Sequence, residues 1–316
     1  MRRVLWTQRR LCCIKSVPPV EDDFAPMEHK IRKAEREDGQ RMQQRTLTAI
    51  IAIPVVLGLM AWPGGVPAVI AAGVVLTLAY AEFTAMCNTS GVPCRLWWGA
   101  IGILLLVLWT QGRVAVPANM PEIALVAVWM LAIVETGRRG RRPVAAIGPT
   151  LLGILWIGGL GAAFVLVRFY QPRDPFTAFG IESGAWAVIA LLLMVWALDI
   201  AAYFFGRKVG RTPLAPGISP RKTIEGAAGG FLAATLMGAV TAPLFSFSTG
   251  GGLLVGACIG VAGQIGDLFE SAVKRELGFK DSGSALPGHG GWLDRIDALL
   301  FASGVMAWFL LRGPGG

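Results

Sequence analysis

The chain has 316 residues, of which 54% are hydrophobic and only 16% charged, and its formal net charge at pH 7 is +9. An average soluble domain has about 45–50% apolar and about 25% charged residues. Residues 1–45 hold 11 Lys and Arg and 7 Asp and Glu, which leaves 31 charged residues in the remaining 271. This composition excludes a soluble globular enzyme, a disordered chain and a basic nucleic-acid-binding module. It predicts a polytopic membrane protein.

The first 44 residues are polar and contain no apolar run long enough for the core of a signal peptide. If translation starts at Met27 or Met42, part of this segment is an artefact of start-site choice. We expect a flexible cytoplasmic tail over 1–44, a membrane-embedded domain over 45–312 and a short C-terminal tail over 313–316.

Nine apolar runs follow the tail, each compatible with a helix that crosses about 30 Å of hydrocarbon. They are 46–62, 66–86, 96–111, 119–134, 150–169, 184–205, 227–246, 251–268 and 296–312. Because an open sheet edge cannot stay unpaired in lipid, we expect an all-α bundle of about nine transmembrane helices and no strands. Small residues such as Gly153, Gly158, Gly159 and Gly161 would let neighbouring helices approach closely.

The charges between the runs predict the orientation of the bundle. With nine spans and the N-terminus inside, the inside segments contain 25 Lys and Arg residues and the outside segments contain 4. Cytoplasmic loops accumulate Lys and Arg, so we expect the N-terminus inside and the C-terminus outside. The positive net charge then reflects topology, and we expect no nucleic-acid partner.

Polar residues collect in two long inside loops, the first of which follows the sixth run. Asp199 lies about 9 Å inside the end of that run, where an ionisable group needs a cavity, a cation or an ion pair. The alternative is a buried ion pair with a neighbouring cation. Ser219, Lys222 and Thr223 combine hydroxyl groups with an ammonium group beside Pro and Gly turns, which suits the binding of phosphate oxygens. The alternative for these three residues is a basic loop that serves topology.

The second inside loop contains an acidic cluster. Asp294 and Asp297 are spaced i, i+3, so a helix would project both from one face at the start of the ninth run. Asp267 ends the eighth run at the same depth. Three converging carboxylates suggest Mg²⁺, which prefers one or two carboxylates together with phosphate oxygens and water. The alternative is that Asp294 and Asp297 only stabilise a helix N-terminus.

Two further polar residues have more than one interpretation. His289, the only histidine outside the tail, is flanked by glycines and could donate to a phosphate, act in acid–base chemistry or close a turn. Glu82 lies near the cytoplasmic end of the second run, where structural pairing and a position in the site wall are equally compatible with the sequence.

The stretch 271–297, with the residues SAVKRELGFKDSGSALPGHGGWLDRID, closely resembles the signature of CDP-diacylglycerol synthases, also called phosphatidate cytidylyltransferases. The stretch 199–226 and the opening QRTLTAII at 44–51 also resemble this family. The resemblance covers about residues 44–312. The departures are the long N-terminal tail and small substitutions such as Ser282 and Ser284.

The resemblance implies the reaction of CTP with phosphatidate to give CDP-diacylglycerol and diphosphate, at the cytoplasmic face of the cell inner membrane. It implies Mg²⁺ bound by Asp267 and Asp294, and a second, monovalent cation site for which K⁺ is the candidate. Homodimers are common in the family, although no residue here indicates one. The expected catalytic residues are Asp267, Asp294, Asp297, Lys274 and Arg295. The expected substrate-binding residues are Asp199, Ser219, Lys222, Thr223, Glu225, Arg275, Lys280, Asp281 and His289.

The implied mechanism agrees with the residue types. A phosphate monoester is already ionised near neutral pH because its second pKa is about 6, so the attack on the α-phosphorus of CTP needs no strong general base. Positioning and charge neutralisation then supply the catalysis. The alternatives are a polyprenol kinase, a CDP synthase for archaeal-type ether lipids, and an ion-coupled transporter using Asp199 and Glu82. A transporter would keep its acids near the bilayer midplane, whereas these acids gather at one surface.

Overall fold

The computed structural model describes residues 53–110, 130, 132–136, 143–172, 179–285 and 290–312. All of them belong to one compact unit, Thr48–Gly316. The expected tail over 1–44, part of the first apolar run and most of the fourth run lie outside the described residues.

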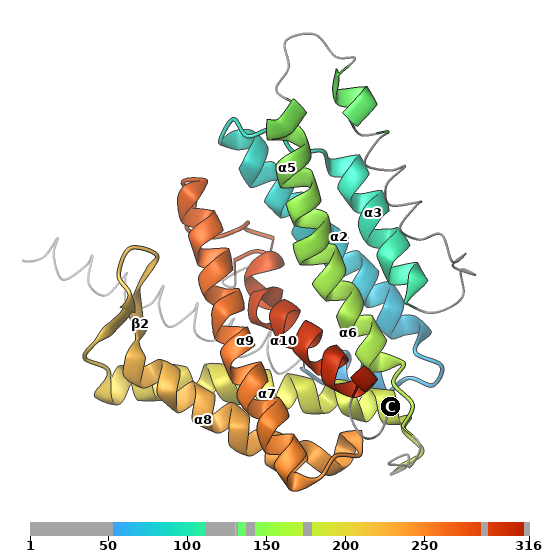
Figure 1. The fold of residues 1–316 in the computed structure, drawn as a ribbon, viewed down its shortest axis with the longest axis vertical. Helices are drawn as coiled ribbons and strands as arrows, with labels where there is room; N and C mark the ends of the chain where they lie inside the picture. The colour runs from blue at the N-terminus through green and yellow to red at the C-terminus, as the bar shows by residue number, and fades with distance from the viewer. Residues whose placement is uncertain are drawn as a thin grey trace, which may run out of the picture. The chain divides into compact units, whose positions relative to one another are not determined.

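The described part of the chain is almost entirely helical (Figure 1). Its α-helices are α2 (Val66–Thr89), α3 (Leu96–Trp109), α5 (Pro143–Gly153), α6 (Leu160–Arg168), α7 (Ser183–Val209), α8 (Ile224–Thr241), α9 (Thr249–Glu276) and α10 (Leu293–Arg312). A π-helical segment, Ile154–Gly159, joins α5 to α6, and a 3₁₀ turn, Ala242–Phe245, follows α8.

Five helical segments within the described residues are long and apolar enough to cross a membrane. They are Val66–Thr89, Pro143–Arg168, Ser183–Val209, Ile224–Phe245 and Thr249–Glu276. The third apolar run forms the shorter helix α3, with 14 residues, and the ninth run lies in α10. The expected class of helical membrane protein is therefore confirmed. The described residues do not reach the expected count of about nine spans.

Small residues bring the helices together as the sequence predicted. Gly153, Gly158 and Gly161 lie directly against side chains of α2 or α3, and a Cβ atom on Gly158 would come within 2.7 Å of Ile103. Gly159 lacks such a neighbour, because its nearest contact would be a carbonyl of its own helix at 4.0 Å. Three of the four predicted glycines therefore permit close packing.

The second half of the chain packs its helices in sequence order, α7 on α8, α8 on α9 and α9 on α10, while α10 also contacts α6 (Figure 1). The backbones of α8 and α9 touch, since a Cβ on Gly238 would lie 2.7 Å from the Cα of Gly256. Ser248 begins α9 with its hydroxyl oxygen accepting from the N–H of Gly251 at 3.1 Å, a typical N-cap. This arrangement places the last turns of α9 beside the first turns of α10.

The expectation of no strands is wrong at one place, the loop between α7 and α8. There β1 (Pro213–Ala215) and β2 (Ser219–Thr223) form an antiparallel hairpin. The argument from unpaired edges in lipid applies only to spans, and this hairpin lies between two helices. Arg275 donates to the carbonyl of Ile218 at 3.2 Å and so connects the hairpin to α9.

Candidate active site

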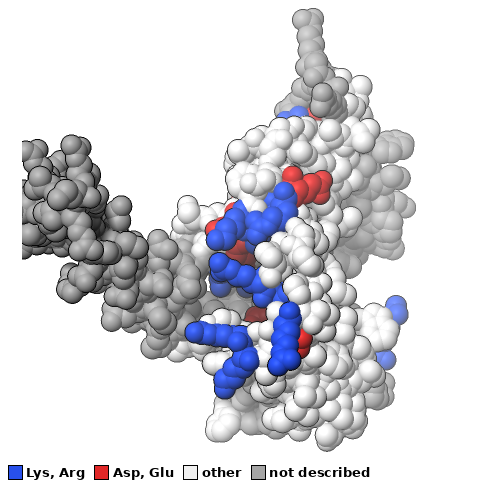
Figure 2. Space-filling model, turned by 90° about the vertical axis from the view of Figure 1, so that its left-hand side faces the viewer, with Lys and Arg blue, Asp and Glu red and all other residues white. Residues whose placement is uncertain are grey.

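A polar cavity of about 280 Å³ opens where α7, α9 and α10 come together. It is lined by Asp199, Asp267, Glu270, Lys274, Asp281, Asp294, Arg295, Asp297 and Ala298. Figure 2 shows Lys and Arg side chains gathered on this face of the molecule around recessed acidic side chains. The cavity therefore combines seven residues that the sequence predicted with two that it did not assign, Glu270 and Ala298.

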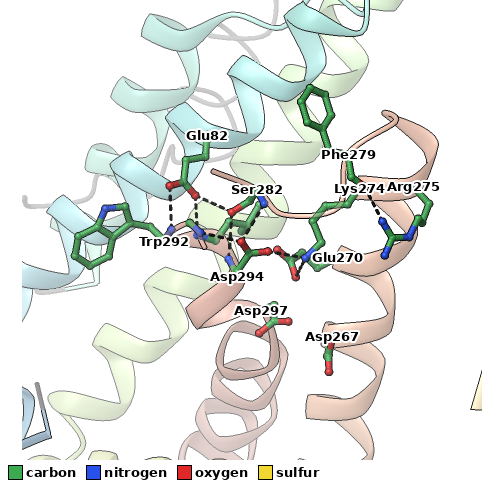
Figure 3. Close-up of polar contacts among 12 residues, drawn as sticks. Glu82, Asp267, Glu270, Lys274, Arg275, Phe279, Ser282, Trp292, Asp294 and Asp297 are labelled. Carbon is green, nitrogen blue, oxygen red and sulfur yellow. Dashed lines mark hydrogen bonds and ion pairs between the residues drawn. The ribbon is translucent and has the colours of Figure 1, made fainter. Parts of the chain in front are cut away.

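Helical spacing puts these side chains on facing surfaces. Asp267, Glu270 and Lys274 follow one another at i, i+3 and i+7 on α9, so they share one face of that helix. Asp294 and Asp297 occupy the first two turns of α10 at the predicted i, i+3 spacing. Figure 3 shows the side chains from α9 and those from the start of α10 facing one another.

Three carboxylates in the cavity lie close together. Ligand atoms of Asp267, Glu270 and Asp297 all lie within 4.8 Å of one another. The Glu270 side chain is 1% exposed, and its buried Oε1 has no hydrogen-bond partner among the described residues. Carboxylate oxygens are the donors that Mg²⁺ prefers, and an unpartnered buried oxygen is free to take a cation. The residues present therefore fit a hard divalent ion.

Asp294 has a different environment from these three acids. Its Oδ1 accepts from Lys274 Nζ at 2.6 Å, while its Oδ2 accepts from the backbone N–H groups of Ser282 at 2.9 Å and Gly291 at 2.8 Å. Gly290 makes this turn with φ at +79°, a conformation that favours glycine. Burial alone would raise the pKa of Asp294, but the hydrogen bonds from Lys274 and from the two N–H groups hold that pKa below its usual value.

The predicted metal pair, Asp267 and Asp294, is thus split by the structure. Asp267 belongs to the three-carboxylate group, whereas both oxygens of Asp294 already have donors. Metal ligation by Asp294 stays a prediction. Glu270 was missed although it lies three residues after Asp267, a spacing that places both side chains on one helix face.

Two cations connect the acids to their surroundings. Lys274 joins Glu270, at 2.9 Å, to Asp294, and its side chain is only 10% exposed. Lys222, from the end of the hairpin, forms an ion pair with Asp267 at the edge of the group. The sequence predicted Lys222 as a substrate-binding residue and Lys274 as a catalytic residue, and each forms an ion pair with an acid of the cavity lining.

Several predicted substrate-binding residues have local partners outside the cavity lining. The Thr223 hydroxyl accepts from the N–H of Gly226 at 3.2 Å and caps α8. Glu225 accepts from the backbone N–H groups of Arg211 at 3.1 Å and Thr212 at 3.3 Å. These bonds fix the turn that leads from the hairpin into α8.

The remaining predicted residues surround the same loops. Arg275 donates to the carbonyl of Phe279 at 2.9 Å in addition to its bond with the hairpin. Ser219 pairs with Ala215 in the hairpin register, and Lys280 is exposed in the loop after α9. His289 lies outside the described residues. Substrate binding by these residues stays a prediction.

For Glu82, whose role the sequence left open, the structure shows pairing: its carboxylate accepts from Ser282, Trp292 and Leu293 and does not line the cavity.

Comparisons with known proteins give a consistent result. The sequence profile of the cytidylyltransferase family matches residues 43–312. A phosphatidate cytidylyltransferase of Brucella suis is 36% identical over 273 residues, which is 85% of this chain and 93% of that protein. A phosphatidate cytidylyltransferase of Staphylococcus aureus is 30% identical over 273 residues, covering 86% of this chain and all of that protein. An uncharacterized protein of Escherichia coli, YnbB, is 44% identical over 131 residues, 41% of this chain and 44% of that protein.

Proposed function

The chain belongs to the cytidylyltransferase family, and we propose that it transfers the cytidylyl group of CTP to phosphatidate, producing CDP-diacylglycerol and diphosphate. The names of its relatives from Brucella suis and Staphylococcus aureus support this substrate pair. The observation that carries the proposal is the cavity in which a three-carboxylate group lies beside Lys274 and Arg295. Such a cavity suits the meeting of two phosphorylated substrates.

In the proposed reaction, an oxygen of the phosphatidate monoester attacks the α-phosphorus of CTP. The bond from that phosphorus to the bridging oxygen of the β-phosphate breaks, and diphosphate leaves. The attacking group is already an anion near neutral pH, so the protein contributes mainly by positioning and by neutralising charge. The Lys274 ammonium group, held by Glu270 and Asp294, and the Arg295 guanidinium group would orient the phosphates.

Mg²⁺ is the metal that we propose for Asp267, Glu270 and Asp297, where it would supply charge neutralisation to the phosphate oxygens. Asp294 stands beside this group as a fourth acid, and K⁺ remains the candidate for a second cation. We also propose that the cavity faces the cytoplasm from the inner membrane, with the N-terminus inside. The bias of Lys and Arg toward the inside segments supports this orientation, and CTP is a cytosolic substrate.

The direct test is incorporation of α-³²P-labelled CTP into the lipid fraction by the purified full-length protein, with and without phosphatidate and Mg²⁺. We expect labelled lipid only when both are present. Label that enters lipid from γ-³²P-CTP, and not from α-³²P-CTP, would instead show a kinase. Transfer to archaeal-type ether phospholipid alone would show a different acceptor, and no labelled lipid in any arm would refute the proposal.

A further inference from the structure

Glu82 lies on α2, some 200 residues before the groups that it contacts (Figure 3). Its Oε1 accepts from the backbone N–H of Trp292 at 2.9 Å. Its Oε2 accepts from the backbone N–H of Leu293 at 3.0 Å and from the Ser282 hydroxyl at 2.9 Å. A single carboxylate on one helix therefore accepts from the start of another helix and from the loop that precedes it.

These bonds satisfy groups that a helix start leaves without partners. The first backbone N–H groups of an α-helix have no carbonyl acceptor within the helix. At the start of α10, the N–H groups of Leu293 and of Trp292, the residue before the helix, donate to Glu82, and that of Asp294 donates to the Ser282 hydroxyl at 3.4 Å. Glu82 thus acts as an N-cap supplied by a distant helix, with a negative charge where the helix dipole favours one.

The same bonds lead directly to the active-site acids. Ser282 donates its hydroxyl to Glu82 and its backbone N–H to Asp294 Oδ2. Asp294 in turn binds Lys274, which binds Glu270. Glu82 therefore connects, through Ser282 and the start of α10, to both helices that carry the carboxylates.

The carboxylate of Glu82 is closely enclosed by glycines. A Cβ on Gly283 would lie 2.7 Å from Glu82 Oε1, and a Cβ on Gly291 would overlap both Glu82 and Ser282. A carboxylate held this closely has little freedom to change its partners, so the first turn of α10 has one defined position relative to α2.

We propose that Glu82 is a positioning residue: it fixes the first turn of α10 so that Asp294 and Asp297 face Glu270 and Asp267 on α9. Among the described residues, Glu82 does not line the cavity, so we assign it a role that acts through the acids that do. This inference rests on the proposed function, because it assigns Glu82 a part in cytidylyl transfer and in divalent-cation binding.

The test uses the full-length protein with Glu82→Gln, which keeps the shape of the side chain but turns one acceptor into a donor that faces a backbone N–H. Substituting a residue that orients a metal ligand without itself contacting the metal typically lowers activity or metal affinity about 10–100-fold. We expect kcat to fall by roughly this factor while KM for CTP changes little. We expect Mn²⁺, followed by electron paramagnetic resonance, to bind about tenfold more weakly per folded protein.

Ser282→Ala removes the hydroxyl that donates to Glu82 and keeps the backbone N–H that donates to Asp294. If Glu82 acts through Ser282, the double variant loses less kcat than the two single losses multiplied together. Ser282→Ala also carries the test, with the same readouts, should Glu82→Gln fail to fold. The matched control is Glu135→Gln, which breaks the ion pair between the buried Glu135 carboxylate and Arg95 at 2.6 Å, a contact that includes neither Glu82 nor Ser282. It should change stability but neither kcat nor Mn²⁺ affinity.

Unchanged kcat and unchanged Mn²⁺ affinity in folded Glu82→Gln would overturn the proposal. So would a loss of the same size in Glu135→Gln, which would show a general effect of stability. A wild-type protein that transfers no cytidylyl group would refute the proposed function alone, because the comparison of Mn²⁺ affinities would still decide whether Glu82 positions the acids.

Discussion

Replacing Lys274 with methionine removes the ammonium group that joins Glu270 to Asp294. The two remaining carboxylates have side chains only 1% and 8% exposed, so water screens them poorly. Removing one partner of a buried ion pair costs about 3–5 kcal/mol, since the other charge stays buried without compensation. At the lower end of the usual conversion, about 2 °C per kcal/mol, this predicts a fall in Tm of roughly 6–10 °C.

The measurement is thermal unfolding of the purified protein in detergent, followed by tryptophan fluorescence. Lys208→Met is the matched control, because Lys208 is exposed at the end of α7. Surface substitutions change stability by about 0.5 kcal/mol or less, which corresponds to about 1 °C. Mg²⁺ should raise the Tm of Lys274→Met more than that of the control, since a cation compensates the uncovered carboxylates. A Tm of Lys274→Met equal to that of Lys208→Met would refute the assignment of Lys274 as the compensating charge.

Three further predictions concern single residues. Glu270→Gln should weaken Mn²⁺ binding more than Asp294→Asn, because Glu270 belongs to the three-carboxylate group; the reverse order, measured by Mn²⁺ titration, would favour the ligand pair expected from sequence. Thr223→Ala should lower stability by about 1 kcal/mol through loss of the α8 cap, and Thr223→Ser should restore it in thermal unfolding. The hydrogen bond from the N–H of Gly64, together with Arg168, lowers the pKa of Glu182 against the effect of burial. The Tm difference between wild type and Glu182→Gln should therefore be largest at neutral pH and shrink as pH falls below about 4.5. A Tm difference that does not change with pH would contradict this.

Local spacing explains which parts of the site could be predicted from the sequence. Asp294 and Asp297 share a helix face because they are three residues apart, and in the structure both line the cavity. Glu270 obeyed the same rule relative to Asp267 and could have been included. The partners of Glu82 could not be predicted, because its contacts with Ser282 and Trp292 span 200 and 210 residues and depend on how the helices pack.

The fold shows the same division between local and distant information. Apolar runs predicted α2 and α7 with approximately correct limits, since a membrane helix is specified by its own hydropathy. The eighth run, 251–268, predicted the start of α9, but the helix continues to Glu276 through polar residues that were expected to form a loop. The hairpin between α7 and α8 was missed because its strands have three and five residues and carry no apolar alternation. Arg275 from α9 stabilises that hairpin, which is a contact between distant segments.

The contact between the α8 and α9 backbones has a consequence for how inherited or engineered variants of this chain should be interpreted. Gly238 and Gly256 lie many residues from Lys222 and Asp267, yet each sits on the helix that leads to one of them. A larger residue at Gly238 would separate the helices and displace Lys222 from Asp267, although Lys222 and Asp267 themselves would be unchanged. An inactivating substitution at either glycine would therefore indicate that the helices had moved apart. It would not indicate that the glycine takes part in the reaction.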